Sequence, residues 1–285
     1  MRAFSRISVV LVWLLLLPAA GIYAQEQDLI ESAGGGTINW SKGVILAKGI
    51  GAPPEQYYGK PQARPMALRA AKLDAMRNLL EVTKGVQIDS QTVVSDFMIS
   101  SDVIAARVDG MVKGAQIVKQ EYLSDGTVEI TMQMSLNGEF SQVVLPQTTM
   151  QTPQASEQSA AEPVVGAPKG DSMIYTGLVV DARGIEVRPA MAPKILDETG
   201  KEVYGSAYVS REFAVQQGMS GYARDLTAAQ SNPRVTHNPL TVKGLRTEGT
   251  GHSDIVVSNG DASHLQSASE NLSFLKKCRV MIVVD

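Results

Sequence analysis

The chain has 285 residues, and its 26 basic and 29 acidic side chains leave a net charge of −3 at pH 7. This mildly acidic balance lacks the clustered lysines and arginines of a nucleic-acid-binding surface, so no nucleic-acid partner is expected. The single cysteine, Cys278, excludes an intramolecular disulfide. The apolar residues that follow it indicate a buried, unreactive position beside a strand.

The first 24 residues have the pattern of a cleavable export signal. Arg2 and Arg6 precede an apolar core from Ile7 to Leu17, and Ala24 supplies the small residue at the expected cleavage site. The core is shorter than the roughly 20 residues that cross a bilayer, and no later apolar run reaches that length. Gln25 follows the site instead of a cysteine, so a lipid anchor is not expected. We therefore expect a periplasmic protein whose charge moves from −3 to −5 when the two arginines are removed.

Residues 146–172 are expected to form a linker. They contain four prolines among glutamine, threonine, serine, alanine and glycine, a composition that buries too little apolar surface to order a chain. The linker divides the mature chain into residues 25–145 and 173–285. Each part has the usual size of one domain.

The first domain is expected to open with a β-hairpin, in which residues 37–40 and 44–49 flank a turn. Trp40 lies in this hairpin and is expected in the core. The glycines at 34–36 have no basic residue or helix start after them. They therefore predict a flexible lead into the first strand and not a phosphate-binding loop.

A long helix is predicted to begin near Pro65 and to end at Lys84, before Gly85. Steps of three and four residues indicate its buried stripe, which is Met66, Ala70, Leu73, Met76 and Leu80. A shorter helix is expected to begin at Ser100 or Ser101 and to end at Gly110.

A second hairpin, with strands at 117–123 and 128–136, follows these helices. The later strand alternates strictly between apolar and polar residues, which is typical of a sheet that helices cover on one face. The first domain is therefore predicted to be α+β, with helices packed on an antiparallel sheet.

The second domain is expected to be α/β. It begins with a strand at 174–180 and a hairpin at 194–204, and glycines interrupt the segment 208–229. A strand at 254–258, a turn at 259–261, a helix at 262–276 and an apolar strand at 279–284 end the chain. This strand-helix-strand order resembles a right-handed crossover unit, with the last strand central in its sheet.

No catalytic, cofactor-binding or metal-ligating residue is predicted. His237, His252 and His264 lie in polar contexts without the close spacing of metal ligands. His252, Ser253 and Asp254 have the residue types of a hydrolase triad, but the residues of a triad converge from separate elements.

Two places could form a contact or ligand surface. Tyr57 and Tyr58 lie in a proline-bounded loop, where exposed aromatic rings suit protein or glycan contacts. Asp181 and Arg183 follow a predicted strand, where α/β sheets often bind ligands. Their charges could hold a polar ligand, although pairing across a turn is the favoured interpretation.

The first domain resembles the bacterial Lpp-twenty lipoprotein family and the similar N-terminal domain of the flagellar assembly protein FlgT. The resemblance covers residues 37–140 and rests on Trp40, the strand 44–51, the alanine-rich helix 67–80, Val108-Asp109-Gly110 and the alternating strand that ends near Leu136. It implies an envelope protein without known enzymatic activity, often located near membranes or flagella. The missing cysteine after Ala24 departs from the lipoprotein pattern and favours a soluble periplasmic form.

We therefore expect a non-enzymatic periplasmic protein with a structural or assembly role in the cell envelope. Its expected partners are other envelope proteins, with flagellar basal-body components as candidates. The alternative is a periplasmic binding module for a small polar ligand or a glycan. Such a ligand would use the tyrosine loop or the Asp181–Arg183 turn.

Overall fold

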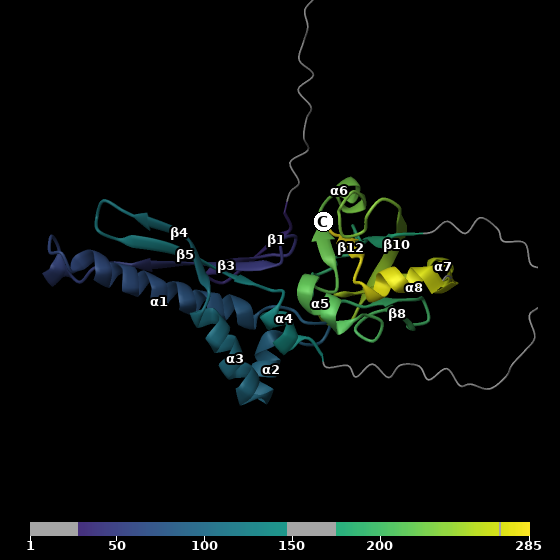
Figure 1. The fold of residues 1–285 in the computed structure, drawn as a ribbon, viewed down its shortest axis with the longest axis horizontal. Helices are drawn as coiled ribbons and strands as arrows, with labels where there is room; N and C mark the ends of the chain where they lie inside the picture. Colours follow the sequence, from purple (N-terminus) through teal and green to yellow (C-terminus); the bar gives the residue numbers. More distant parts are fainter. Residues whose placement is uncertain (1–27, 147–174, 268) are drawn as a thin grey trace, which may run out of the picture.

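The computed structural model describes residues 28–146, 175–267 and 269–285. The predicted export signal and nearly all of the predicted linker lie outside these residues. The described chain forms two β-sheets, one in each half of the sequence (Figure 1). Within these residues, no helix is both long enough and apolar enough to cross a bilayer.

The first sheet is antiparallel, with the strand order β1-β2-β3-β5-β4. Its strands are β1 (Ile30–Ala33), β2 (Gly36–Asn39), β3 (Val44–Gly51), β4 (Gln116–Tyr122) and β5 (Val128–Ser135). Both predicted hairpins are confirmed. The glycines at 34–36 do not form a flexible lead, because Gly34 and Gly35 turn the chain from β1 into β2 and Gly36 begins β2. Gly34 has a φ of +52°, a backbone conformation that glycine adopts at little cost.

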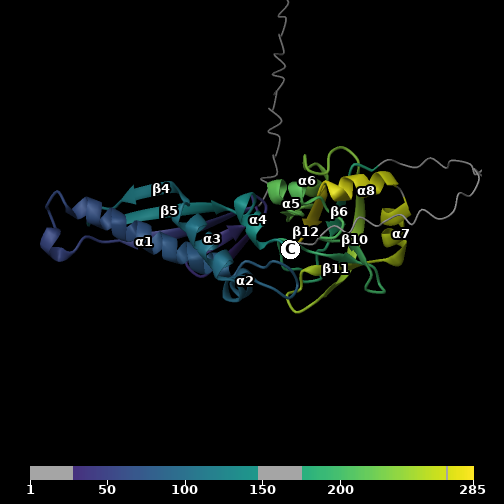
Figure 2. The same ribbon diagram turned by 60° about the horizontal axis from the view of Figure 1, so that its bottom comes forward.

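One face of this sheet is covered by α1 (Ala63–Lys84), which follows a short 3₁₀ helix, η1 (Glu55–Tyr57) (Figure 2). The long helix was predicted, but none of the five residues expected in its buried stripe is among its buried residues. The buried residues are Ala67, Ala71, Ala75, Leu79, Val82 and Thr83. Leu73, which was expected in the core, is 65% exposed.

This difference follows from the close approach of α1 to β3. A Cβ atom on Gly49 would lie 2.1 Å from the backbone nitrogen of Ala75, and one on Gly51 would lie 2.2 Å from the carbonyl oxygen of Ala67. Only glycine in the strand and alanine in the helix fit at this separation. Larger apolar residues, Leu79 and Val82, are buried only in the later part of α1, beyond this close approach.

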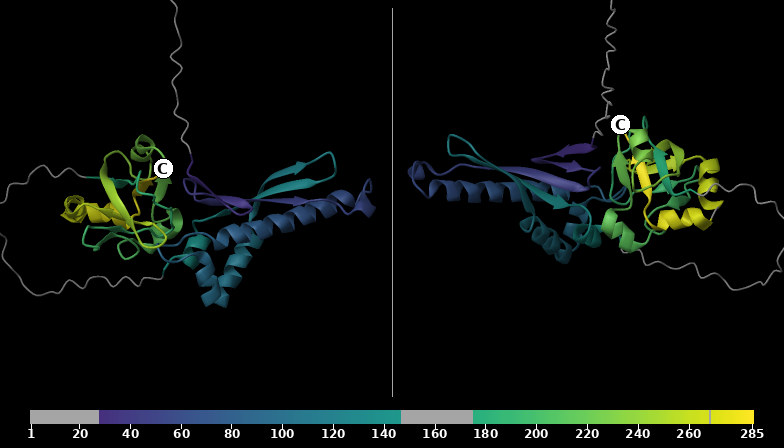
Figure 3. Two further views of the ribbon diagram at one scale, coloured as in Figure 1. Left: turned by 180° about the vertical axis from the view of Figure 1, so that it is seen from behind. Right: turned by 45° about the horizontal axis from the view of Figure 1, so that its top comes forward.

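Two further helices, α2 (Val94–Ser100) and α3 (Asp102–Lys113), project from the first domain (Figure 3). Ser101 caps α3, since its hydroxyl accepts a hydrogen bond from the Ile104 amide at 3.4 Å. The predicted stop at Gly110 was wrong, because α3 continues to Lys113. Burial of Val112 in this last turn outweighs the roughly 1 kcal/mol that glycine costs inside a helix. A short helix, α4 (Glu139–Val144), ends the domain.

The second sheet has the strand order β8-β7-β11-β10-β6-β12-β9. Its strands are β6 (Gly177–Asp181), β7 (Ile195–Leu196), β8 (Glu202–Tyr204), β9 (Gly221–Ala223), β10 (Pro239–Glu248), β11 (Asp254–Val257) and β12 (Val280–Val283). Its helices are α5 (Arg211–Gln217), α6 (Leu226–Gln230), α7 (Asn259–Ser267) and α8 (Ser269–Lys276). Together with the first domain, this confirms an α+β fold followed by a second mixed-sheet domain.

The predicted crossover unit is only partly correct. The chain ends in strand-helix-strand order, and β12 lies between β6 and β9 as a buried, central strand. However, β11 pairs antiparallel with β10, which is parallel to β6 and hence to β12. The helical segment starts at Asn259 and divides into α7 and α8, so the turn expected at 259–261 is helical. Strands β10 and β6 lie between β11 and β12 in the sheet, and β10 was not predicted by the sequence analysis.

We predict that Gly49→Ala destabilises the protein by about 1–3 kcal/mol, because its new methyl group would overlap the backbone of α1. Gly110→Ala is the matched control, since a Cβ there meets no atom within 4 Å and the residue lies inside α3. It should stabilise the protein by up to about 1 kcal/mol. Urea unfolding of the two variants checks both values, and equal stabilities would contradict the close-approach explanation.

Candidate functional site

The two sheets meet at an interface that buries polar and aromatic side chains from both halves of the chain. The rings of Trp40 and Tyr222 contact edge to face, with centroids 5.7 Å apart. The Ser41 hydroxyl donates to the Tyr222 carbonyl at 2.9 Å. The Tyr222 hydroxyl accepts from the Ala190 amide at 2.9 Å and donates to the Ala190 carbonyl at 2.8 Å. Trp40 is therefore buried as predicted, and its ring packs against the second domain.

A loop of the first domain continues this interface through backbone hydrogen bonds to the second domain. The amide of Met191 donates to the Gln87 carbonyl at 3.0 Å, and the amide of Ala192 donates to the Ile88 carbonyl at 2.7 Å. The amide of Gly251 donates to the Ser90 carbonyl at 2.7 Å. These backbone hydrogen bonds hold the two domains in one relative position, so the domains form one body at this junction.

A buried carboxylate lies under this loop. The Ser90 hydroxyl donates to Asp254 Oδ2 at 2.5 Å, and the Lys194 amide donates to Oδ1 at 3.2 Å. Burial raises the pKa of Asp254 although both hydrogen bonds oppose the shift. Burial likewise raises the pKa of Glu202, whose Oε1 lacks a hydrogen-bond partner among the described residues.

The triad-like sequence at 252–254 does not converge in space. His252 Nδ1 lies 3.1 Å from the Thr247 hydroxyl, while Asp254 faces Ser90. The Ser253 hydroxyl is buried without a hydrogen-bond partner among the described residues. Among the residues that the structure describes, no three His, Cys, Asp or Glu side chains gather closely enough to hold a metal ion.

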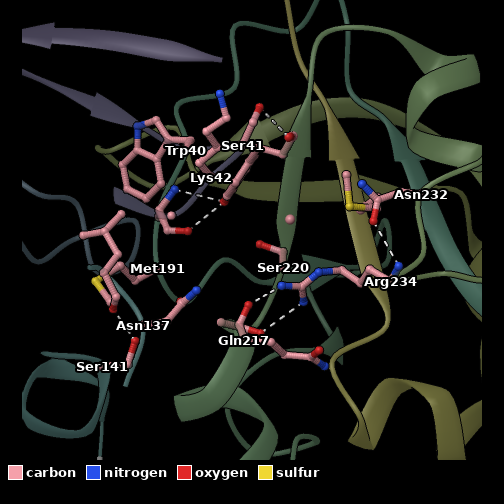
Figure 4. A pocket seen from close by; sticks show the side chains of 17 residues that line it. Trp40, Ser41, Lys42, Asn137, Ser141, Met191, Gln217, Ser220, Asn232 and Arg234 are labelled. Carbon is pink, nitrogen blue, oxygen red and sulfur yellow. Dashed lines mark hydrogen bonds between the residues drawn. The ribbon is translucent and has the colours of Figure 1, made fainter. Parts of the chain in front are cut away.

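Beside the Trp40–Tyr222 contact, the interface encloses a cavity of about 120 Å³ (Figure 4). Lys42 and Asn137 reach it from the first domain, and Ser220, Asn232 and Arg234 reach it from the second. Its side-chain lining is mostly polar, and its titratable lining groups are Lys42, Tyr222 and Arg234. The cavity therefore offers hydrogen-bond donors and positive charge, but no carboxylate or imidazole.

Arg234 supplies the central charge of this cavity. Its guanidinium donates to the carbonyls of Cys278 at 2.7 Å and Gly218 at 3.2 Å, and it also contacts the Gln217 carbonyl. Two of these carbonyls end helix α5, where positive charge is favoured. No carboxylate pairs with Arg234 among the described residues, and burial lowers its pKa. Three of its five N–H groups are thus used, and two remain.

Ser220 presents a polar group without a partner. Its Oγ atom is buried and makes no hydrogen bond within the described chain. It lies close enough to the Tyr222 hydroxyl to oppose the rise in pKa that burial causes there, which still brings that pKa to about 12. A phenol with this pKa stays protonated at neutral pH, so Tyr222 serves the cavity as a structural hydrogen-bonding group.

The predicted contact residues lie elsewhere, at two separate places. Tyr57 lines a shallow hollow with Pro61, Pro65 and Met66 at the start of α1, and Tyr58 is 57% exposed. The hollow lies at the end of the first domain that is remote from the second sheet (Figure 1). The role of these tyrosines as a contact surface stays a prediction.

Asp181 and Arg183 pair with each other at the end of β6. Their hydrogen bonds are 2.8 and 3.0 Å long, and Lys243 lies 3.4 Å from the same carboxylate. The hydrogen bond from Arg183 lowers the Asp181 pKa to about 2, although burial opposes the shift. This arrangement is the turn pairing that the sequence analysis favoured. A ligand that bound this carboxylate would have to compete with Arg183 and Lys243.

Cys278 is buried, as expected, and burial raises the pKa of its thiol to about 11. Its φ of +54° places it in the left-handed region, two residues before β12. The conformation turns the chain so that the Cys278 carbonyl accepts from Arg234. The sequence analysis gave no signal for Ser220 or Arg234, since neither belongs to a motif with recognisable spacing.

The comparison with known protein families concerns the second domain. Residues 177–285 match the family described as the second domain of Treponema pallidum Tp0624. The matched range runs from the start of β6 to the end of the described chain, so it contains the whole second sheet. No curated protein matches the chain. The chain is thus similar, over its second sheet, to a domain that also follows another domain in its own protein.

We predict that Asp254→Asn makes the protein relatively more stable as the pH rises from about 4 to 7. The folded protein holds the Asp254 proton more tightly than the unfolded chain does, so its free energy of unfolding falls as the pH rises through the raised pKa. The charged groups that act on Asp254 are Asp89 of the first domain and Lys194 and Glu202 of the second domain. Chemical unfolding at several pH values measures the difference between variant and wild type.

The matched control is Glu55→Gln, which removes an exposed carboxylate far from the interface. Its stability difference from wild type should stay flat over the same pH range. A flat difference for Asp254→Asn as well would contradict the conclusion that burial raises the pKa of this carboxyl group.

Proposed function

We propose that this protein is exported and acts without catalysis, as a structural or assembly component of the bacterial cell envelope. The export pattern of residues 1–24 supports its location. The resemblance of residues 37–140 to Lpp-twenty proteins and to FlgT supports an envelope role, with a flagellar link as its narrower form. The similarity to a Treponema pallidum domain supports a bacterial setting.

The observation that carries this proposal is that the two domains form one rigid body, which exposes large apolar side chains away from the interface between the domains. Backbone pairing and a common core join the two domains. At the junction of α2 and α3, which projects from this body, Ile99 is 85% exposed and Val103 is 65% exposed (Figure 3). Large apolar side chains on a protruding helical pair are typical of a surface that contacts another protein.

The test combines location with site-specific crosslinking in cells. We expect the mature N-terminus at Gln25 in the periplasmic fraction. A photo-crosslinking residue at position 99 should capture a defined envelope protein. The same residue at the exposed Lys72 of α1 should not capture it. An unprocessed cytoplasmic chain, or identical adducts at both positions, would contradict the proposal.

A second candidate function is binding of a small polar ligand, and the interdomain cavity favours it. The unpartnered Ser220 hydroxyl and the two remaining N–H groups of Arg234 can all donate to one acceptor-rich ligand. A cavity of about 120 Å³ accommodates only a few non-hydrogen atoms. The ligand class is therefore a small anion such as a carboxylate, or an acidic group of a larger molecule that enters from the surface.

We predict that Ser220→Ala separates binding from folding. The variant should equal wild type in stability or exceed it by about 1 kcal/mol, because it removes a buried hydroxyl without a partner. A ligand that occupies the cavity should raise the melting temperature of wild type and should raise that of the variant less. Thermal-shift measurements with acetate, phosphate, sugar acids and peptidoglycan fragments provide the check. Absence of any shift in wild type would reject this candidate.

A further inference from the structure

Strand β4 forms an open edge of the first sheet with apolar side chains along it. All seven of its residues are exposed, whereas alternate residues of its neighbour β5 are buried. Val118 is 48% exposed and Tyr122 is 50% exposed. Long exposed edges are templates for pairing with another strand, and β4 has no strand on its outer side (Figure 2).

The direction of the β4 backbone follows from its pairing with β5. The amide of Leu123 donates to the Thr127 carbonyl at 2.9 Å, where the hairpin closes. In an antiparallel pair, residues alternate between those whose backbone groups face the partner strand and those whose backbone groups face outward. Counting back from Leu123, Glu121 and Lys119 face β5, so the N–H and C=O groups of Gln120 and Tyr122 point to the open side.

The sequence around Gln120 is complementary to itself in one antiparallel register. When Gln120 is placed opposite Gln120 of a second copy, its outward N–H and C=O can exchange two hydrogen bonds. Lys119 then lies opposite Glu121 of the second copy, and the two-fold axis repeats this pair. Tyr122 comes opposite Val118, but Val118 is the extra residue of a bulge in β4, so the regular ladder is confined to residues 119–121.

We propose that two copies of this chain associate through antiparallel β4–β4 pairing about a two-fold axis at Gln120. The pairing joins the two five-stranded sheets into one sheet. The charge pattern favours a second copy of this chain as the partner, because Lys119 of each copy lies opposite Glu121 of the other. Within one copy these two side chains already pair at 2.8 Å on the same face, so both are held beside the new edge.

The strength of this dimer is limited by two features of β4. A bulge between Ile117 and Lys119 interrupts the regular ladder and confines the pairing to a short segment. A short strand edge buries less surface than a stable protein interface, which exceeds roughly 1,000 Å². The dimer is therefore weak, and its population depends on protein concentration.

The experiment is sedimentation velocity of the chain from Gln25 onward, over a wide range of protein concentration. Wild type should shift from monomer to dimer. K119E and E121K should each weaken the dimer by about tenfold or more, because two attractive pairs become two repulsive pairs. The double variant K119E/E121K exchanges the charges and should restore the dimer. K113E, at an exposed position of α3, is the matched control and should leave the dimer unchanged.

Mixing the two single variants gives the sharpest test. The acidic pair of K119E faces the basic pair of E121K in the proposed register, so the mixture should form heterodimers at concentrations where each variant alone is monomeric. Circular dichroism and thermal unfolding confirm that all variants are folded. A monomeric wild type at every concentration, a dimer that both single variants retain, or a mixture without heterodimers would each overturn the proposal.

Discussion

The structure depends on the pairing of a first-domain loop with the second domain. The carbonyls of Gln87 and Ile88 accept backbone hydrogen bonds from the amides of Met191 and Ala192. Backbone bonds of this kind are lost together if the domains separate, and each leaves a buried polar group without a partner. The junction is consequently a continuous part of the fold and not a flexible contact between two independent units.

This junction buries polar and charged side chains that neither domain would bury alone. It covers Asp254 with Ser90 from the other domain, which buries the carboxylate and raises its pKa. It also closes the cavity around Ser220 and Arg234 by bringing Lys42 and the Trp40 ring against β9. The same rigidity leaves the projecting helices and the edge of β4 as the surfaces at which other molecules can add to the body.

Local patterns in the sequence predicted a large part of the secondary structure, and long-range contacts explain the errors. Alternation over 128–136 and the turns at 41–43 and 124–126 predicted both hairpins, because strand pairing across a short turn is a local interaction. The buried stripe of α1 was wrong because Gly49 and Gly51 admit the helix backbone so closely that alanines occupy its buried positions where it crosses β3. The crossover was misassigned because β10 enters the sheet between elements that are neighbours in sequence.

The sequence by itself determined the α+β class and the solitary buried cysteine, because these depend on composition and on periods of two and of three to four residues. It also indicated the Asp181–Arg183 pair, whose members are two residues apart. Only the tertiary structure decided that the two domains join, that Ser220 and Arg234 share a cavity, and that β4 is an open edge. These features arise from residues far apart in the chain, and no local period encodes which distant surfaces meet.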